Sequence, residues 1–408
     1  LESAWARKRI ADIRDRLDDK WPEALTNAVL NRRRPQHERV QALRIMQWIG
    51  PKPSMATLAR LSSDSDPIIR QQAAYALGLS ADDTANKTLV DLLRDRDAAV
   101  RRKAAESLSR RGSSIELKQV AHMLTSKEPF EAWAARRLLE IGDTDQLRED
   151  VLGATDQRAF IHGATALLLA DPEEDTSRAI VDRNLQLMQG FVNDRDFVDM
   201  LRVFQLALMR SDMTEDSVPE LGEALAEEYP SSSAIINREL IRLLTFLQVD
   251  SIMDRYLAEL KQDSPDQETL HLAIHLTHLK DGWTTPDKLT VFQHLDPPKD
   301  GGNSIPGYLQ NVARRFGKRL TSEELPVAID NGAQWPSAAM AALLRMPEQL
   351  STNQINRILT LDKELADETD DRYRRLKIAI VAILARDGSA ASQAYLREIY
   401  ERDPVRRV

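Results

Sequence analysis

Three histidines near the middle of the chain have a spacing that could bind a metal ion. His271, His275 and His278 are separated by four and three residues, which places them within about 60° of one another on one helix face. Glu268 precedes the first of them by three residues. A histidine pair one helical turn apart beside a carboxylate can bind zinc or iron. The spacing therefore predicts a candidate metal-dependent module at these four residues.

A structural interpretation of the same stripe competes with the metal site and is favoured. Leu272, Leu276 and Leu279 lie on an adjoining arc of the helix, so the histidines fall at the edge of an apolar face. Half-buried histidines in such positions can bond to carbonyl groups or acids. We therefore predict no cofactor and interpret the stripe as structural, with the metal site as the alternative.

The absence of cysteine removes several kinds of chemistry. A chain of 408 residues without cysteine has no disulfide, thiolate metal site, cysteine nucleophile or attachment for a c-type haem. No Ser-His-Asp arrangement and no close pair of carboxylates can be defended from spacing alone. We therefore predict no catalytic residue and expect that the chain is not an enzyme.

Runs of arginine could line a groove for nucleic acid, but charge disfavours this interpretation. The runs are Arg32-Arg33-Arg34, Arg101-Arg102, Arg110-Arg111, Arg136-Arg137 and Arg314-Arg315. The formal net charge is −8, and residues 151–300 hold 13 basic against 27 acidic side chains. We also expect the aromatic residues Trp48, Tyr75 and Trp133 to fall in the core. In this interpretation the arginines lie on solvated helix faces and form salt bridges between helices.

The composition predicts helices and almost no sheet. Only 5% of the residues are aromatic, and glycine (15) and proline (18) are too sparse for the turns that many short strands need. The longest apolar run, residues 164–170, is far shorter than the roughly 18 residues of a membrane span. The first helical pattern is charged throughout, unlike a signal peptide, and the chain begins at Leu1 without Met. We expect a piece of a longer protein.

A period of 31 residues organises the first part of the chain. Residues recur at this interval in three sets: Arg39, Arg70 and Arg101; Ala42, Ala73, Ala104 and Ala135; Met46, Leu77, Leu108 and Leu139. Asp66 and Asp97 are suited to cap the second helix of each pair. Arg70 and Arg101 follow four residues later, where they can pair with an acid of the same or a neighbouring repeat. Stacked helix pairs of this kind share one core.

The string Asp-Pro…Arg…Ala-Ala…Ala-Leu-Gly at residues 66–78 resembles HEAT repeats of the short bacterial kind. The resemblance implies an all-α, right-handed α-solenoid of antiparallel helix pairs, a HEAT-like or ARM-like superhelix. The length predicts about 13 to 15 pairs. We predict N-terminal capping helices at 1–34, regular repeats at 35–170, acidic irregular repeats at 171–300 and C-terminal repeats at 301–408, continuous with the same solenoid.

Enzymes built on HEAT-type repeats can be examined by motif. The deoxyhypusine hydroxylases need several His-Glu pairs to hold two irons, and His37-Glu38 is the one such pair in the sequence, so we exclude that class. The DNA alkylpurine glycosylases demand a basic concave face with aromatics around a catalytic Asp, which the net charge disfavours. Phycobilin lyase-like repeat proteins are harder to exclude, although no residue favours them.

The second half is similar to the helical region of large exported proteins of planctomycetes and their relatives. The similar strings are residues 237–244, 271–276, 282–284, 301–304, 307–308 and 395–400. In those proteins the region follows a β-propeller "membrane-bound dehydrogenase" domain and precedes a c-type cytochrome domain. The resemblance implies a bacterial, exported or periplasmic setting, and the haem-binding cysteines have no counterpart here.

These observations together predict a non-catalytic α-solenoid scaffold. Its expected partner is another protein or a neighbouring domain of the same polypeptide, within a larger exported, redox-associated protein. Two alternatives stay open: the metal-dependent module at Glu268, His271, His275 and His278, and a HEAT-like protein that binds nucleic acid.

Overall fold

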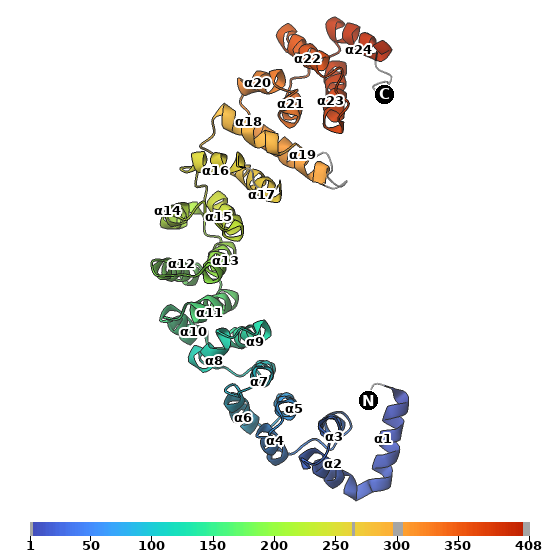
Figure 1. Ribbon diagram of the computed structural model, residues 1–408, viewed down its shortest axis with the longest axis vertical. Helices are drawn as coiled ribbons and strands as arrows, with labels where there is room; N and C mark the ends of the chain where they lie inside the picture. Colours follow the sequence, from blue (N-terminus) through green and yellow to red (C-terminus); the bar gives the residue numbers. More distant parts are fainter. Residues whose placement is uncertain (1–2, 263–265, 297–304, 403–408) are drawn as a thin grey trace. The chain divides into compact units, whose positions relative to one another are not determined.

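The computed structural model describes residues 3–262, 266–296 and 305–402. Within these ranges the chain forms 24 α-helices and three short 3-10 helices, and no β-strand (Figure 1). The chain divides into two compact units, Leu1–Met213 (unit 1) and Thr214–Val408 (unit 2). No helix in the described ranges is long and apolar enough to cross a membrane.

Unit 1 is a stack of helix pairs arranged in two rows (Figure 1). The helices α3, α5, α7, α9, α11 and α13 each contact the next and form one row, called here the odd row; α2, α4, α6, α8, α10 and α12 form the even row. The bounds are α1 (Ala4–Leu17), η1 (Asp18–Lys20), α2 (Trp21–Leu30), α3 (Gln36–Trp48), α4 (Met55–Ser62), α5 (Pro67–Leu77), α6 (Thr84–Leu92), α7 (Ala98–Arg111), α8 (Leu117–Leu124), α9 (Pro129–Leu139), α10 (Thr144–Leu152), α11 (Gln157–Ala170), α12 (Glu174–Met188) and α13 (Asp194–Arg210).

Unit 2 continues with helix pairs of less regular length. Its bounds are η2 (Glu215–Ser217), α14 (Pro219–Glu227), α15 (Ala234–Phe246), α16 (Met253–Leu260), α17 (Asp266–Leu276), α18 (Thr285–His294), α19 (Ile305–Phe316), η3 (Gly317–Arg319), α20 (Glu324–Asp330), α21 (Pro336–Leu343), α22 (Thr352–Glu364), α23 (Asp371–Asp387) and α24 (Ala390–Arg402). Neighbouring helices such as α15 and α17, or α21 and α23, pack side by side.

Acidic side chains begin four of the six helices of the odd row, α5, α7, α9 and α11. Asp66 accepts a hydrogen bond from the backbone N–H of Ile68 at 2.8 Å, and Asp97 accepts one from Ala99 at 3.0 Å. Asp156 caps α11 in the same way. Each cap satisfies a backbone donor that the first helical turn leaves without a partner. The capping residue therefore marks where each of these four helices begins.

Buried ion pairs connect neighbouring repeats. Each arginine of the 31-residue frame contacts a carboxylate of the following repeat, and the contacts are Arg39 with Asp64 at 2.5 Å, Arg70 with Asp95 at 2.7 Å and Arg101 with Glu131 at 2.5 Å. Burial raises the pKa of Asp95, but its hydrogen bonds to Arg70 and to the backbone N–H of Asp97, together with the positive charges of Arg70 and Arg96, hold that pKa below its ordinary value. In the first two pairs the acid precedes the capping Asp by two residues, so capping and pairing belong to different side chains.

Small residues of the repeat frame lie at the centre of unit 1. Ala73, Ala104 and Ala135 have no exposed surface, and neither have Leu77 and Leu108. Alanine at these positions allows the helices of the odd row to approach closely, and leucine fills the space between them. The periodic pattern therefore identifies core positions.

The number of helix pairs is close to the lower end of the predicted 13 to 15 pairs or partial pairs. The described residues form 24 α-helices, which make about twelve pairs, and three short 3-10 helices beside them. The Gly301–Ser304 string lies outside the described residues.

Candidate functional sites

Three of the residues predicted to bind metal, Glu268, His271 and His275, lie on α17, and His278 lies in the turn after it. An arginine of a neighbouring helix binds the carboxylate. Arg238 of α15 donates to both oxygens of Glu268, with its Nε 2.8 Å from Oε2. These hydrogen bonds hold the pKa of the Glu268 carboxyl below its ordinary value. A bidentate guanidinium occupies the lone pairs that a metal ion would need. Glu268 is therefore a structural partner of α15.

The histidines of the stripe make hydrogen bonds to backbone carbonyls. His275 Nδ1 lies 2.8 Å from the carbonyl oxygen of His271, and His271 Nε2 lies 3.3 Å from that of Arg238. A ring nitrogen that bonds to a carbonyl carries a proton and offers no lone pair to a metal. Burial lowers the pKa of His275 to about 4, and burial also lowers the pKa values of His271 and His278. The rings are therefore neutral at neutral pH.

The stripe does not converge on one point. Glu268 and His271 line a pocket with Arg238, whereas His275 and His278 line a different one beside Lys280. Within the described ranges, no group of three or more His, Cys, Asp or Glu side chains is placed to hold a metal ion. In the structure the spacing produces a polar stripe in which His271 and His275 of α17 are half-buried and His278, in the following turn, is exposed. The metal site stays a prediction of the sequence.

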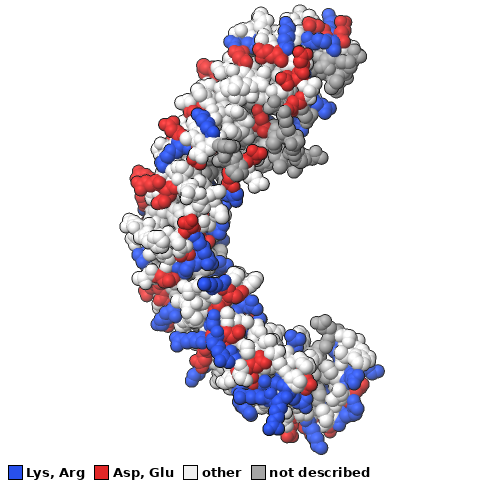
Figure 2. Space-filling model, in the orientation of Figure 1, with Lys and Arg blue, Asp and Glu red and all other residues white. Residues whose placement is uncertain are grey.

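A second candidate site lies on the odd row of unit 1. It is called here the basic-aromatic face and consists of Tyr75 of α5, Arg102, Lys103 and Arg110 of α7, and Phe130 and Trp133 of α9. Figure 2 shows lysine and arginine side chains gathered over the part of unit 1 where α3 to α9 lie. Phe130 occupies the frame position of Ile68 and Ala99 in the two preceding repeats. The repeat therefore places an aromatic ring beside the basic side chains of α7.

Cations lie over the aromatic rings of this face. The Lys103 ammonium and the Arg110 guanidinium are 5.8 and 5.3 Å from the centre of the Tyr75 ring. The Arg102 guanidinium is 5.9 Å from the centre of the Phe130 ring. These separations are within the range of cation–π attraction, about 6 Å. The contacts hold the cations on the face and orient the rings.

The aromatic residues expected in the core are exposed instead. Trp48 has 75% of its surface exposed and Trp133 49%, while Tyr75 is half-buried. On α9 the buried side is formed by Ala132, Ala135 and Leu139, and Trp133 falls on the opposite side of the helix. The prediction of core positions is therefore wrong for both tryptophans. Phe130, which is 62% exposed, was missed, although its frame position outside the buried set could have revealed it.

One carboxylate lies within the basic-aromatic face. Glu106 pairs with Lys103 and lies 3.6 Å from Arg102. Arg110 has no ion pair with any described residue, and its guanidinium lies over the Tyr75 ring. The basic-aromatic face therefore retains net positive charge beside its aromatic rings.

Comparison with known proteins identifies the repeats. A family model described as HEAT repeats matches residues 54–140. A curated deoxyhypusine hydroxylase of Drosophila pseudoobscura pseudoobscura is 24% identical over 60% of this chain and 76% of its own length. The Drosophila melanogaster deoxyhypusine hydroxylase is 23% identical over 55% of this chain and 70% of its own. The crystal structure of a Kap121p mutant, 12% identical, covers 94% of this chain and 45% of that one with a TM-score of 0.51.

These findings correct two predictions about function. The prediction of a non-catalytic scaffold that is not an enzyme is wrong, because the curated relatives are named as an enzyme. The exclusion of the hydroxylase class is corrected by the same relatives. The donor set for two metal ions is nevertheless not assembled among the described residues. His37 and Glu38 are both exposed, and Glu38 pairs with Arg34, so this motif does not fit a buried metal centre.

The fold prediction is confirmed by the family match and by the likeness to Kap121p. The matched residues 54–140 contain the complete helices α4 to α9 and the whole of the basic-aromatic face. The chain is therefore an all-helical solenoid protein that contains HEAT repeats.

Proposed function

We propose that the chain binds an acidic polypeptide along the basic-aromatic face, as the substrate-binding part of a HEAT-repeat enzyme. The enzyme class is supported by the names of the curated relatives. The polypeptide is supported by the chemistry of the face itself. The larger exported assembly and a neighbouring domain as partner stay predictions of the sequence.

The observation that carries this proposal is the exposure of Phe130 and Trp133 on a face whose three cations outnumber its one carboxylate. The two rings are three residues apart on α9, 62% and 49% exposed, so they share one side of that helix and form a patch rather than single exposed side chains. Such rings provide much of the binding energy in protein interfaces, together with arginine. An extended polypeptide could place apolar side chains against the rings and a carboxylate against Arg110.

A polypeptide fits this face better than a nucleic acid does. A phosphate backbone carries negative charge at regular, short intervals and needs a continuous basic track. Glu106 interrupts the cations of α7, and Glu140 lies against Arg136 and Arg137 on α9. A peptide can place acidic residues only where a cation is unpaired, so the interrupted pattern suits it.

The reaction is proposed only as far as the relatives' names go, namely hydroxylation of deoxyhypusine. No step is derived for it, because the described residues do not assemble a metal-binding donor set. Incubation of the protein with a polypeptide that contains deoxyhypusine, in the presence of ferrous iron and oxygen, followed by mass spectrometry, tests this reaction directly. Gain of one oxygen atom supports it, and an unchanged mass with the polypeptide bound contradicts it.

Binding is tested by fluorescence anisotropy with a labelled peptide that alternates Asp and Phe. We expect the Phe130→Ser and Trp133→Ser variants each to weaken binding by about tenfold, the usual effect of removing an anchoring aromatic side chain. Lys87→Glu, an exposed charge reversal on α6 of the even row, is the matched control and should leave binding unchanged. Equal loss in the control, or tighter binding of duplex DNA than of the peptide, would contradict the proposal.

A further inference from the structure

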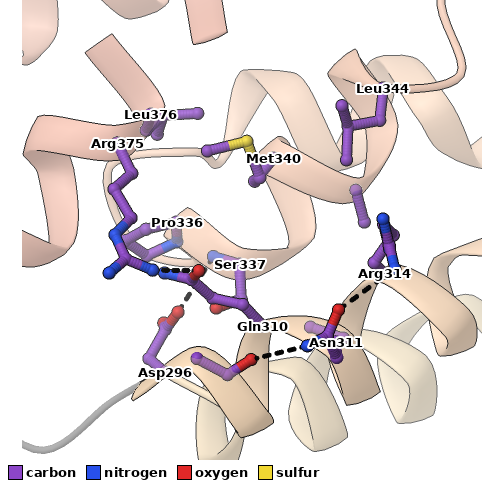
Figure 3. Close-up of a pocket in the computed structure, with 13 residues that line it drawn as sticks. Asp296, Gln310, Asn311, Arg314, Pro336, Ser337, Met340, Leu344, Arg375 and Leu376 are labelled. Atoms are coloured by element: carbon purple, nitrogen blue, oxygen red, sulfur yellow. Dashed lines mark hydrogen bonds between the residues drawn. The ribbon is translucent and has the colours of Figure 1, made fainter. Parts of the chain in front are cut away.

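A cavity of about 360 Å³ lies between three helices of unit 2, α19, α21 and α23. Its side chains come from all three: Gln310, Asn311 and Arg314 from α19, Ser337 and Met340 from α21, and Arg375 and Leu376 from α23 (Figure 3). The cavity is separate from the histidine stripe and from the basic-aromatic face. Its volume is at the lower end of the range for small-molecule sites, about 300–1,000 Å³.

Two guanidinium groups line this cavity, and each is hydrogen-bonded to a side-chain amide oxygen. Arg314 Nη2 donates to the side-chain oxygen of Asn311 at 3.0 Å, and Arg375 donates to the side-chain oxygen of Gln310 (Figure 3). Among the described residues neither arginine makes an ion pair. An amide oxygen orients a guanidinium but leaves its charge in place, so each group retains donors for an anion.

Asp296, the one acidic side chain among the described residues that line the cavity, lies at the end of the cavity where Arg375 lies. Asp296 accepts a hydrogen bond from the backbone N–H of Ser337 at 2.9 Å, near the beginning of α21. Its charge is therefore held beside the Ser337 end, as Figure 3 shows. Arg314 lies on α19 one turn beyond Gln310, away from this carboxylate. The most positive part of the cavity is therefore the part around Arg314.

The wall facing Arg314 is apolar. Met340, Ala341 and Leu344 line the cavity from α21 and its end, and Ala313 lines it from α19. Leu344 is 50% exposed, so a ligand would remove apolar surface from water. Methionine is flexible and polarisable, which allows Met340 to adapt to ligands of different shape. The wall suits a short hydrocarbon body.

We propose that this cavity binds a small amphipathic anion. The carboxylate or phosphate head group pairs with Arg314, with Asn311 beside it, and the apolar body lies against Met340 and Leu344. Arg375 and Gln310 close the opposite end of the cavity. Carboxylates and phosphates share the geometry that a guanidinium recognises with two parallel hydrogen bonds.

Isothermal titration calorimetry of the whole protein with octanoate, octyl phosphate, octanol and inorganic phosphate tests this proposal. We expect at least one of the two alkyl anions to bind, and more tightly than both octanol and inorganic phosphate, because the site needs both charge and hydrocarbon. The tighter of the two anions identifies the head group. If neither alkyl anion binds, or if octanol binds as tightly as both, the proposal is overturned.

Variants of the arginines assign the binding to this cavity. Arg314→Ala should weaken binding of the preferred anion by about tenfold or more, which corresponds to about 1.4 kcal/mol. Arg315→Ala removes an exposed arginine of the same helix outside the cavity and should bind as the unchanged protein does. Met340→Lys should reduce the preference for the alkyl anion over inorganic phosphate, because it removes apolar wall. Circular dichroism checks that each variant is folded. If the Arg314→Ala protein is not folded, the Arg314→Gln variant is used in its place. Unchanged affinity in the folded Arg314 variant overturns the assignment.

Discussion

At the scale of single residues, buried histidine is the feature that most distinguishes this chain. His162 of α11 and His275 of α17 both have pKa values lowered to about 4, and burial is the largest cause in each case. Positive neighbours add to it: Arg158 beside His162, and His271 and Arg242 beside His275. A histidine that stays neutral in the fold but charges in the unfolded chain couples stability to pH.

The expected consequence is loss of stability as the pH falls. Between the ordinary histidine pKa, about 6.5, and about 4, the unfolded chain binds a proton at each histidine that the folded chain does not. The stabilisation is therefore complete above about pH 6.5 and decreases toward pH 4. When the pH is lowered from about 7 to about 5, the free energy of unfolding of the His275→Gln variant should fall by about 1 kcal/mol less than that of the unchanged protein. Urea unfolding at both pH values measures this difference. His37→Gln, at an exposed histidine, is the control. An unchanged pH dependence in His275→Gln would contradict this interpretation.

The sequence could predict which residues are unusual more readily than what they do. The spacing of His271, His275 and His278 places the first two on one helix, α17, whereas His278 lies in the turn that follows it. Spacing along one helix says nothing about the neighbouring helix, and it is Arg238 of α15 that occupies Glu268. Trp133 shows a similar limit of sequence reasoning: its neighbours Ala132 and Ala134 on α9 are buried, whereas Trp133 itself faces water.

At the scale of elements, local signals predict where helices begin. Asp66 and Asp97 are expected to cap helices, and the structure has α5 at Pro67–Leu77 and α7 at Ala98–Arg111. Capping residues and proline act within one turn of the chain, so sequence reveals them. The cavity between α19, α21 and α23 could not be predicted, because it depends on how helices far apart in sequence pack.

The close packing of the odd row makes a specific prediction at Ala104. This residue has no exposed surface, and α7 packs against both α5 and α9. Ala104→Phe should lower the free energy of unfolding by roughly 1–3 kcal/mol, since the added ring must displace neighbouring side chains. Ala99→Phe, at an exposed position of the same helix, is the matched control. Chemical unfolding of both variants measures the difference, and an Ala104→Phe protein as stable as the control would refute the close packing.

At the scale of the whole molecule, the contacts are local along the chain. In unit 1 each helix packs mainly against its pair and against the next helix of its row. The strict 31-residue period does not extend past unit 1, but helix pairing does, so unit 2 builds its own core from residues such as Leu240, Phe292 and Leu376. Repeat proteins of this kind are stabilised by each repeat and its nearest neighbours.

Division of the chain between Met213 and Thr214 should therefore leave two folded parts. Fragments 1–213 and 214–408 should each unfold cooperatively, because each keeps the helix pairs that form its core. The first fragment should retain binding of the Asp-Phe peptide, and the second should retain binding of the alkyl anion. Circular dichroism of each fragment during urea unfolding, followed by the two binding assays, measures these outcomes. A fragment without a cooperative transition would show that its core needs residues from the other unit. A cooperatively folded first fragment that no longer binds the peptide would show that the basic-aromatic face is incomplete without unit 2.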